Sequence, residues 1–176
     1  RVTRDRDPHV FGTHPPRVSQ SRHSSADELR WAEPEGPCSP APVRRIERAR
    51  TEVDYLLFFS ARYCQSYHGA RAAADRAVLV PTAEREPSLG LAIFAPLFRG
   101  VRAIMYNSFE ERAVIQAIAR NEHVPGVVVG VGSEIPATAD AARFRKTFGI
   151  ESPFVIYVGR IDENKGCNEL VDYFTR

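Results

Sequence analysis

The sequence predicts an α/β fold built on a parallel sheet, and three observations carry this prediction. Short apolar runs rich in aromatic and β-branched residues recur along the chain, as is typical of strands buried on both faces. Segments with helical periodicity separate these runs, and such alternation favours a parallel sheet with helices on both faces. The apolar fraction of 43% is that of a globular protein.

The predicted elements follow one another from residue 43. We expect helices over residues 43–51, 62–76, 88–100, 108–121, 141–149 and 167–176, and strands over 53–60, 77–83, 101–108, 126–132 and 154–159. The helix at 108 has the clearest start, because Ser108 can cap it and Glu111 can return a bond to the Ser108 N–H. The helix at 141 carries Phe144 and Phe148 on one face and ends at Gly149.

Residues 1–42 show no clear period and hold many of the prolines, which predicts a long surface loop with short extended pieces. Trp31 lies in this segment. It either anchors the loop to the body of the protein or forms a wall of a substrate pocket. The chain begins without Met and stops inside a predicted helix, so we expect a fragment of a longer protein.

Composition limits the classes of function. The net charge of +2 gives no general case for binding to nucleic acid or a membrane surface. No apolar run approaches the roughly 20 residues of a membrane span, and no leader pattern opens the chain. The three cysteines, Cys38, Cys64 and Cys167, show neither a disulfide framework nor metal-ligand spacing. A reducing compartment, the cytoplasm, is therefore expected.

The stretch YVGRIDENKG, residues 157–166, joins a predicted strand to a predicted helix. Ligands of open parallel sheets bind beyond the carboxyl ends of the strands, and a helix N-terminus attracts anions. Arg160 and Lys165 add a two-pronged donor and a mobile point charge, which together suit a diphosphate. The alternative is a solvated turn in which these cations only pair with Asp162, Glu163 and Glu169.

YVGRIDENKG resembles the GR…KG motif of retaining glycosyltransferases of the GT-B fold, the group called family 4 or group 1. VVVGVGSEIP is similar to the strand and turn that close the first domain of that family, and ARFRKTFGIESPFVIYVGRIDENKG is similar to the run that opens its second domain. The resemblance covers roughly residues 53–176. It implies two Rossmann-like domains with parallel sheets, only partly present in this chain.

The resemblance also implies a domain layout and a function. Residues 1–50 would be an irregular segment of the first domain, 51–135 its later, acceptor-side part, and 136–176 the start of the nucleotide-sugar-binding domain. The expected reaction moves a sugar from a nucleotide diphosphate sugar to an unknown acceptor with retention, without a metal or another cofactor. Rival interpretations are a nucleotide-sugar epimerase of the same fold and a non-catalytic binding or scaffold remnant.

The implied site residues follow from the motif. Gly159, Arg160, Lys165 and Gly166 would bind the donor diphosphate, with Arg160 and Lys165 catalytic. The catalytic glutamate pair of the family and its glycine-rich first turn have no counterpart in this chain. Four further residues are candidates for the acceptor side or the cleft, and the alternative for each is an ordinary surface position: Arg62, Tyr63, His68 and Glu84. Glu84 stands where the family often has a histidine, so no residue is assigned that role.

Overall fold

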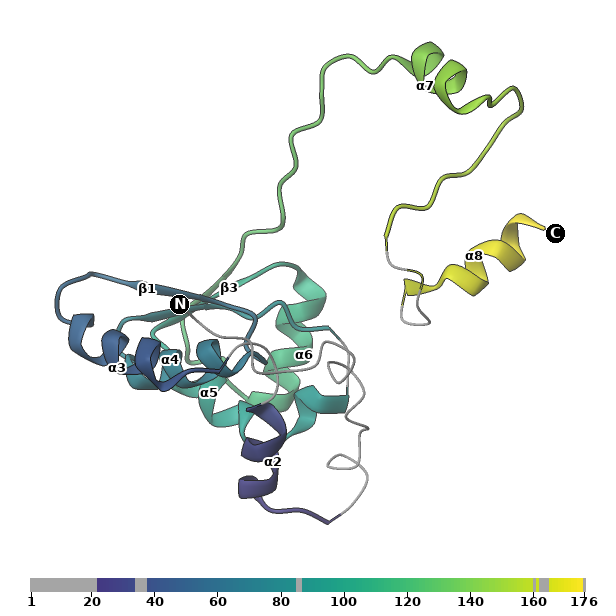
Figure 1. Ribbon diagram of the computed structural model, residues 1–176. Coiled ribbons are helices and arrows are strands. Elements are labelled where there is room, and N and C mark those ends of the chain that lie inside the picture. The colour runs from purple at the N-terminus through teal and green to yellow at the C-terminus, as the bar shows by residue number, and fades with distance from the viewer. Residues whose placement is uncertain (1–21, 34–37, 85–86, 160, 162–164, 176) are drawn as a thin grey trace. The chain divides into compact units, whose positions relative to one another are not determined.

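The structure is a computed structural model that describes residues 22–33, 38–84, 87–159, 161 and 165–175. The chain divides into two compact units, residues 1–132 and 133–176. The first contains a sheet and its helices, and the second contains two short helices (Figure 1). The assignment of these units to domains of a glycosyltransferase stays a prediction.

The first unit is built on a sheet of four parallel strands in the order β1-β2-β3-β4. The strands are β1 (Leu56–Phe59), β2 (Ala77–Val80), β3 (Ala103–Tyr106) and β4 (Gly126–Val128). Leu56 pairs with Ala77 at the start of β1, and Ile104 pairs with Gly126 at the other edge of the sheet. The four strands and their parallel arrangement confirm the α/β class, although each strand is shorter than the apolar run that predicted it.

Helices connect the strands and precede them. They are α2 (Ser25–Ala32), α3 (Pro40–Ala49), α4 (Cys64–Ala72), the 3₁₀ helix η1 (Pro87–Gly90), α5 (Phe94–Gly100) and α6 (Phe109–Ala119). Helix α2 was not predicted, because its residues fall in the Pro-rich segment. It begins with a capping box, in which the Ser24 side chain accepts from the Asp27 N–H and the Asp27 carboxylate accepts from the Ser24 N–H. Trp31 on α2 packs against the core, as the anchor interpretation predicts.

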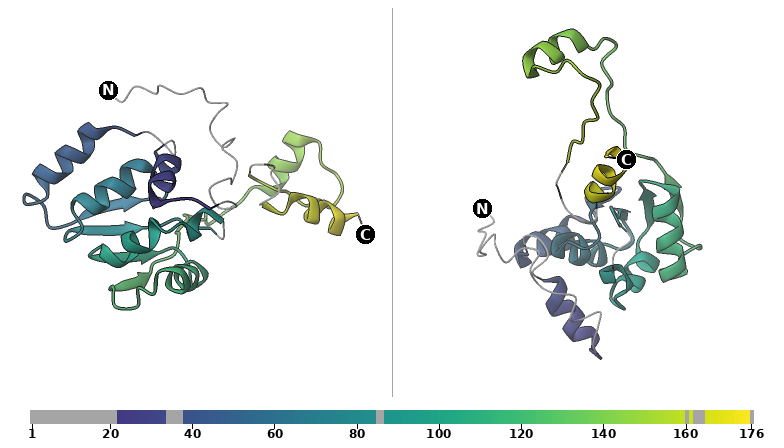
Figure 2. Two further views of the ribbon diagram at one scale, coloured as in Figure 1. Left: turned by 90° about the horizontal axis from the view of Figure 1, so that it is seen from below. Right: turned by 90° about the vertical axis from the view of Figure 1, so that its right-hand side faces the viewer.

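The helices cover only one face of the sheet, so the prediction of helices on both faces was wrong for the described residues. Because each strand lies beside its predecessor in one direction, right-handed crossovers place α4, α5 and α6 on the same side. Figures 1 and 2 show the strands along one side of the unit and the helices against the other. On the open face Leu57, Phe59 and Val127 keep 54%, 58% and 54% of their surface exposed.

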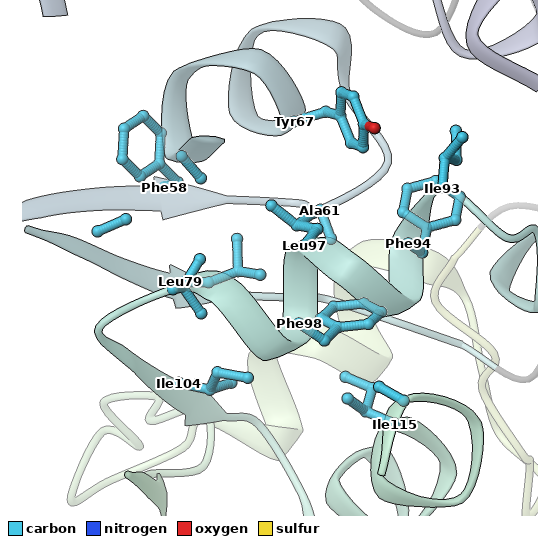
Figure 3. Close-up of a cluster of buried hydrophobic side chains, with 14 of the residues drawn as sticks. Phe58, Ala61, Tyr67, Leu79, Ile93, Phe94, Leu97, Phe98, Ile104 and Ile115 are labelled. Atoms are coloured by element: carbon cyan, nitrogen blue, oxygen red, sulfur yellow. The ribbon is translucent and has the colours of Figure 1, made fainter. Parts of the chain in front are cut away.

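The hydrophobic core lies between the sheet and these helices. Figure 3 shows Phe58, Leu79 and Ile104 of the strands gathered with Tyr67 of α4 and with side chains of α5 and α6. Among the core side chains with almost no exposed surface are Phe94, Leu97, Phe98 and Ile115. The alternation along β1 and β3 therefore separates a buried face from a more open one, whereas Leu79 and Val80 of β2 are both buried.

Asn121 is a buried polar residue beside this core. Its side-chain amide donates to the Phe98 carbonyl at 3.2 Å and to the Tyr106 hydroxyl at 3.3 Å. Burial raises the pKa of the Tyr106 hydroxyl, while its hydrogen bond with Asn121 acts in the opposite direction. The Asn121 contact ties the end of α5 to β3.

Cys38 and Cys64 form a disulfide, which corrects the expectation that the cysteines are unpaired. Their Cα atoms are 5.3 Å apart. A separation of 26 residues along the chain carries no pairing signal, because pairing depends on how α3 and α4 lie against each other in the fold. Persistent disulfides are rare in the reducing cytosol, so this pair also counts against the cytoplasmic expectation.

The second unit holds α7 (Ala141–Phe148) and α8 (Cys167–Phe174). Phe144 packs against Phe148 and Phe154, and α7 ends at Gly149 in a left-handed conformation, as predicted. The predicted strand over 154–159 was wrong, because this run has no ladder partner among the described residues. None of the described side chains of this unit is buried, and Val158 is 85% exposed.

None of the helices in the described part of the chain combines the length and the apolar composition that a membrane span requires.

Candidate functional site

Two places match the sequence-based site predictions: the carboxyl edge of the sheet in the first unit and the start of α8 in the second. They belong to different units, so each is a separate candidate.

At the carboxyl edge, Ser60 follows β1 and Thr82 follows β2 at nearly the same level. The Thr82 hydroxyl donates to the Ser60 hydroxyl at 2.7 Å. Both residues have positive φ, 64° for Ser60 and 48° for Thr82. A β-branched residue in this region is a conformational outlier that the surroundings must hold in place. The Ser60 N–H donates to the Val80 carbonyl at 2.9 Å, which extends the pairing of β1 and β2 into this turn.

Glu111 is the charged residue buried at this edge, with 6% of its surface exposed. Its carboxylate accepts from the backbone N–H of Ala83 at 2.6 Å and from that of Asn107 at 2.5 Å. One side chain of α6 therefore binds the chain just after β2 and just after β3. The N–H of Glu111 donates to the Ser108 hydroxyl at 3.1 Å, which confirms the predicted helix cap.

The second half of the predicted capping box was wrong. In the described residues the Glu111 carboxylate bonds the N–H of Asn107 rather than that of Ser108. Sequence reasoning also missed the bond to Ala83, which is 28 positions away. The missed signal was a carboxylate in the first turn of a helix that follows a buried strand, since such a side chain can reach the ends of neighbouring strands. The neighbouring Glu110 has a lowered pKa, because its carboxylate accepts hydrogen bonds from its own N–H and from Ser108.

Three of the four acceptor-side candidates lie in or near this edge. Arg62 and Tyr63 follow β1, and Tyr63 is the N-cap residue of α4 with 39% of its surface exposed. Glu84 is exposed and follows Ala83, the residue that Glu111 holds. The carboxyl ends of adjacent parallel strands meet at one edge, so the structure brings these three residues to the same edge.

His68 takes a different position, on the second turn of α4. Its ring stands edge-on to the Tyr67 ring, with the ring centroids 5.0 Å apart. Tyr67 is buried and its hydroxyl accepts from Arg71 of the same helix. The described contact of His68 is therefore an aromatic packing contact within α4, and its role in a cleft stays a prediction.

The start of α8 carries the described part of the predicted phosphate site. Lys165 precedes Gly166, which is the N-cap residue and has φ 66°. Gly166 has no side chain, so the N-cap residue of this helix supplies no capping oxygen of its own. The predicted helix after the GR…KG motif is confirmed, beginning at Cys167. Arg160 lies outside the described residues, and its role stays a prediction.

The described residues contain no group of three or more His, Cys, Asp and Glu that could hold a metal ion. The expectation of a metal-free site stays a prediction. No protein-family model, curated protein or solved structure matches the chain.

Proposed function

We propose that this chain is part of a retaining glycosyltransferase that transfers a sugar from a nucleotide diphosphate sugar to an acceptor. The observation that carries the proposal is the arrangement at α8. A glycine with positive φ is the N-cap residue of the helix, and Lys165 stands directly before it. A diphosphate matches this combination, since helix N–H groups and a nearby ammonium both stabilise phosphate oxygens.

In the proposed reaction the bond between the anomeric carbon and the leaving phosphate oxygen breaks, and the acceptor hydroxyl forms the new glycosidic bond on the same face. The negative charge that develops on the nucleoside diphosphate is what Arg160, Lys165 and the α8 N-terminus would stabilise. Gly159 and Gly166 would let the backbone approach the phosphates. The acceptor would lie toward Arg62, Tyr63 and Glu84 at the carboxyl edge of the first unit, with His68 as a further candidate.

The GT-B identity, the donor, the acceptor and the cytoplasmic location are all parts of this proposal. The Cys38–Cys64 disulfide is the observation that fits the cytoplasmic location least. A metal ion is not part of the proposed site, because the cations and the helix end supply the positive charge.

A non-catalytic binding module of the same fold is the second candidate, and one observation favours it. The run over residues 154–159 forms no ladder among the described residues, and the described side chains of the second unit are all at least partly exposed. A phosphate site on such a unit is less preorganised than catalysis requires. No observation on the described residues specifically favours an epimerase of the same fold.

The test measures the binding of nucleotide diphosphate sugars to isotope-labelled protein. NMR is the method of choice, because weak binding is expected of this chain. The variant Lys165→Ala should weaken binding about tenfold or more, as loss of a charged phosphate donor does. The matched control is Lys146→Ala in α7, the other lysine of the chain, which should leave affinity unchanged. Equal affinity of wild type and Lys165→Ala, or no binding of any nucleotide diphosphate sugar, would contradict the phosphate site.

Transfer itself separates the enzymatic candidates. Nucleoside diphosphate released only when an acceptor is present indicates a transferase, whereas interconversion of donor sugars without acceptor indicates an epimerase. Binding without either reaction would indicate that the chain is a non-catalytic binding module.

A further inference from the structure

The Cys38–Cys64 disulfide joins the start of α3 to the start of α4. Cys38 lies two residues before the first residue of α3, and Cys64 is the first residue of α4. No residue of α3 is fully buried, and Ile46 packs against the core of the first unit from a partly buried position. The disulfide is therefore the covalent part of an attachment that is otherwise made by partly exposed side chains.

Helix α3 lies along α4 and contacts it through side chains that are not fully buried. Ile46 packs toward Gly69 of α4, where its Cδ1 atom lies 3.0 Å from the position that a Cβ would take. At the end of α3, Arg50 pairs with Asp75 at 3.9 Å, and both side chains are about half exposed. Exposed ion pairs of this kind contribute little. Packing at Ile46 and the disulfide thus carry the attachment.

We propose that the Cys38–Cys64 disulfide is a redox-controlled cross-link that decides whether α3 stays docked on α4. This inference does not depend on the proposed function. Its reductant is a dithiol of the thioredoxin or dithiothreitol class. The two sulfurs differ in access, since Cys38 is exposed and Cys64 is 2% exposed.

The exchange has a defined direction. A thiolate of the dithiol attacks the exposed Cys38 sulfur, the S–S bond breaks, and the bonding pair leaves on the Cys64 sulfur. That sulfur stands at the N-terminus of α4, whose N–H groups no described side chain caps, and a thiolate is stabilised there. The second thiol of the reductant then displaces Cys38. Two protons and two electrons convert the disulfide into two thiols, and the dithiol becomes its own disulfide.

The expected consequence is local. Opening of the link frees residues 38–49 to leave α4, while β2, β3, α5 and α6 keep the core contacts they make without α3. Opening of the disulfide also removes a covalent constraint on the first turn of α4. Tyr63 is the residue directly before Cys64, so the turn after β1 gains freedom in the same event.

The test is amide hydrogen exchange on the full chain carrying Cys167→Ser, which removes the third cysteine, whose thiol could exchange with the pair. Dithiothreitol should speed exchange in α3 about tenfold or more and leave β2 and β3 within about twofold. The variant Cys38→Ser should reproduce the reduced pattern without reductant. If that variant fails to fold, the test rests on the exchange rates of α3 in oxidised and in reduced Cys167→Ser protein.

Two outcomes would overturn the proposal. One is alkylation of both Cys38 and Cys64 in air-oxidised protein before any reductant is added, which would mean that the disulfide does not form. The other is equal exchange of α3 in the oxidised and reduced states, which would mean that the link does not hold the helix.

Discussion

The carboxylate of Glu111 accepts a hydrogen bond from the backbone N–H of Ala83 at 2.6 Å, across 28 positions of the chain. The same carboxylate accepts from the N–H of Asn107 at 2.5 Å. Because Ala83 follows β2 and Asn107 follows β3, one buried side chain satisfies the free N–H groups of two neighbouring strand ends. The carboxyl edge, where the acceptor-side candidates lie, therefore depends on a residue that was not among those candidates.

Replacement of Glu111 by Ala should lower the free energy of unfolding by about 2–4 kcal/mol, since two N–H groups lose a charged partner. Glu111→Gln should cost less, because one oxygen can still accept. The matched control is Glu110→Gln, an exposed glutamate on the same helical turn, for which a much smaller change is expected. Denaturant unfolding followed by circular dichroism measures all three, and equal effects at positions 110 and 111 would contradict the bridging role.

Much of the fold could be predicted because strands rich in β-branched and aromatic residues leave a local signature. The four runs of β-branched and aromatic residues became β1 to β4. Helix α6 was predicted with its cap because Ser108 and Glu111 stand three residues apart. The start of α8 at Gly166 was predicted for a similar reason, from a glycine and a following helical pattern.

The remaining features depend on non-local geometry. Which face of the sheet the helices cover follows from the order of the strands in space, and periodicity does not contain that order. The partner of Cys64 and the second partner of Glu111 come from segments 26 and 28 positions away. The run over 154–159 has the composition of a strand, but a strand also needs a neighbour, and the described residues supply none. Helix α2 was missed because prolines around it obscured the Ser24–Asp27 capping box.

The pKa of Asp27 provides a pH-dependent prediction. Hydrogen bonds from the Ser24 N–H, the Ser24 hydroxyl and Arg30 lower this pKa from 3.8 to about 2. The folded state therefore holds the proton less tightly than the unfolded chain. The resulting stabilisation is complete above about pH 4 and is lost as the pH falls toward 2.

Two measurements check this prediction for Asp27. NMR titration of its carboxyl carbon should give a pKa near 2, and Ser24→Ala should raise this pKa, since the hydroxyl bond is lost while the bonds from the backbone N–H and from Arg30 remain. Asp27→Asn should be less stable than wild type at pH 6, with the difference shrinking by pH 2. A titration midpoint of Asp27 near 4 would remove the basis of the prediction.

Gly69 lies in the interior of α4, where helix propensity alone would favour alanine by about 1 kcal/mol. A Cβ there would stand 2.6 Å from Cε1 of Phe58, whose ring is 8% exposed in the core. Gly69→Ala should therefore lower the free energy of unfolding, by about 1–3 kcal/mol. Gly100 is the matched control, since nothing lies within 4 Å of its Cβ position, and Gly100→Ala should be neutral or stabilising. Thermal unfolding of both variants measures these changes. A Gly69→Ala variant that is more stable than the wild type would contradict the close contact between α4 and β1.

The start of the second unit is exposed and forms no helix or strand over residues 133–138. Glutamyl endopeptidase should cut after Glu134 at least about tenfold faster than after Glu28 or Glu111, which are buried. Mass spectrometry of early digests identifies the cuts, and Glu134→Gln should abolish the early product. If the rates after Glu134 and Glu111 were the same, the first unit would not be the more stable body that its core implies.

The open face of the sheet leads to the last prediction. Leu57 and Phe59 of β1 are 54% and 58% exposed beside each other on one edge strand. An apolar, unpaired edge strand is a site for association with other chains. We expect the protein to self-associate at concentrations of about 100 μM, within the range in which exposed apolar surface drives association.

The double variant Leu57→Thr with Phe59→Thr keeps good strand formers but removes the apolar surface, so it should stay monomeric with an unchanged circular dichroism spectrum. The matched control is Phe109→Thr, because Phe109 is 74% exposed but starts α6 instead of lying on the sheet. Light scattering coupled to size-exclusion chromatography measures the mass of each species. If Phe109→Thr restored the monomer as well as the double variant did, association would follow total exposed apolar surface, and the open face of the sheet would have no particular role.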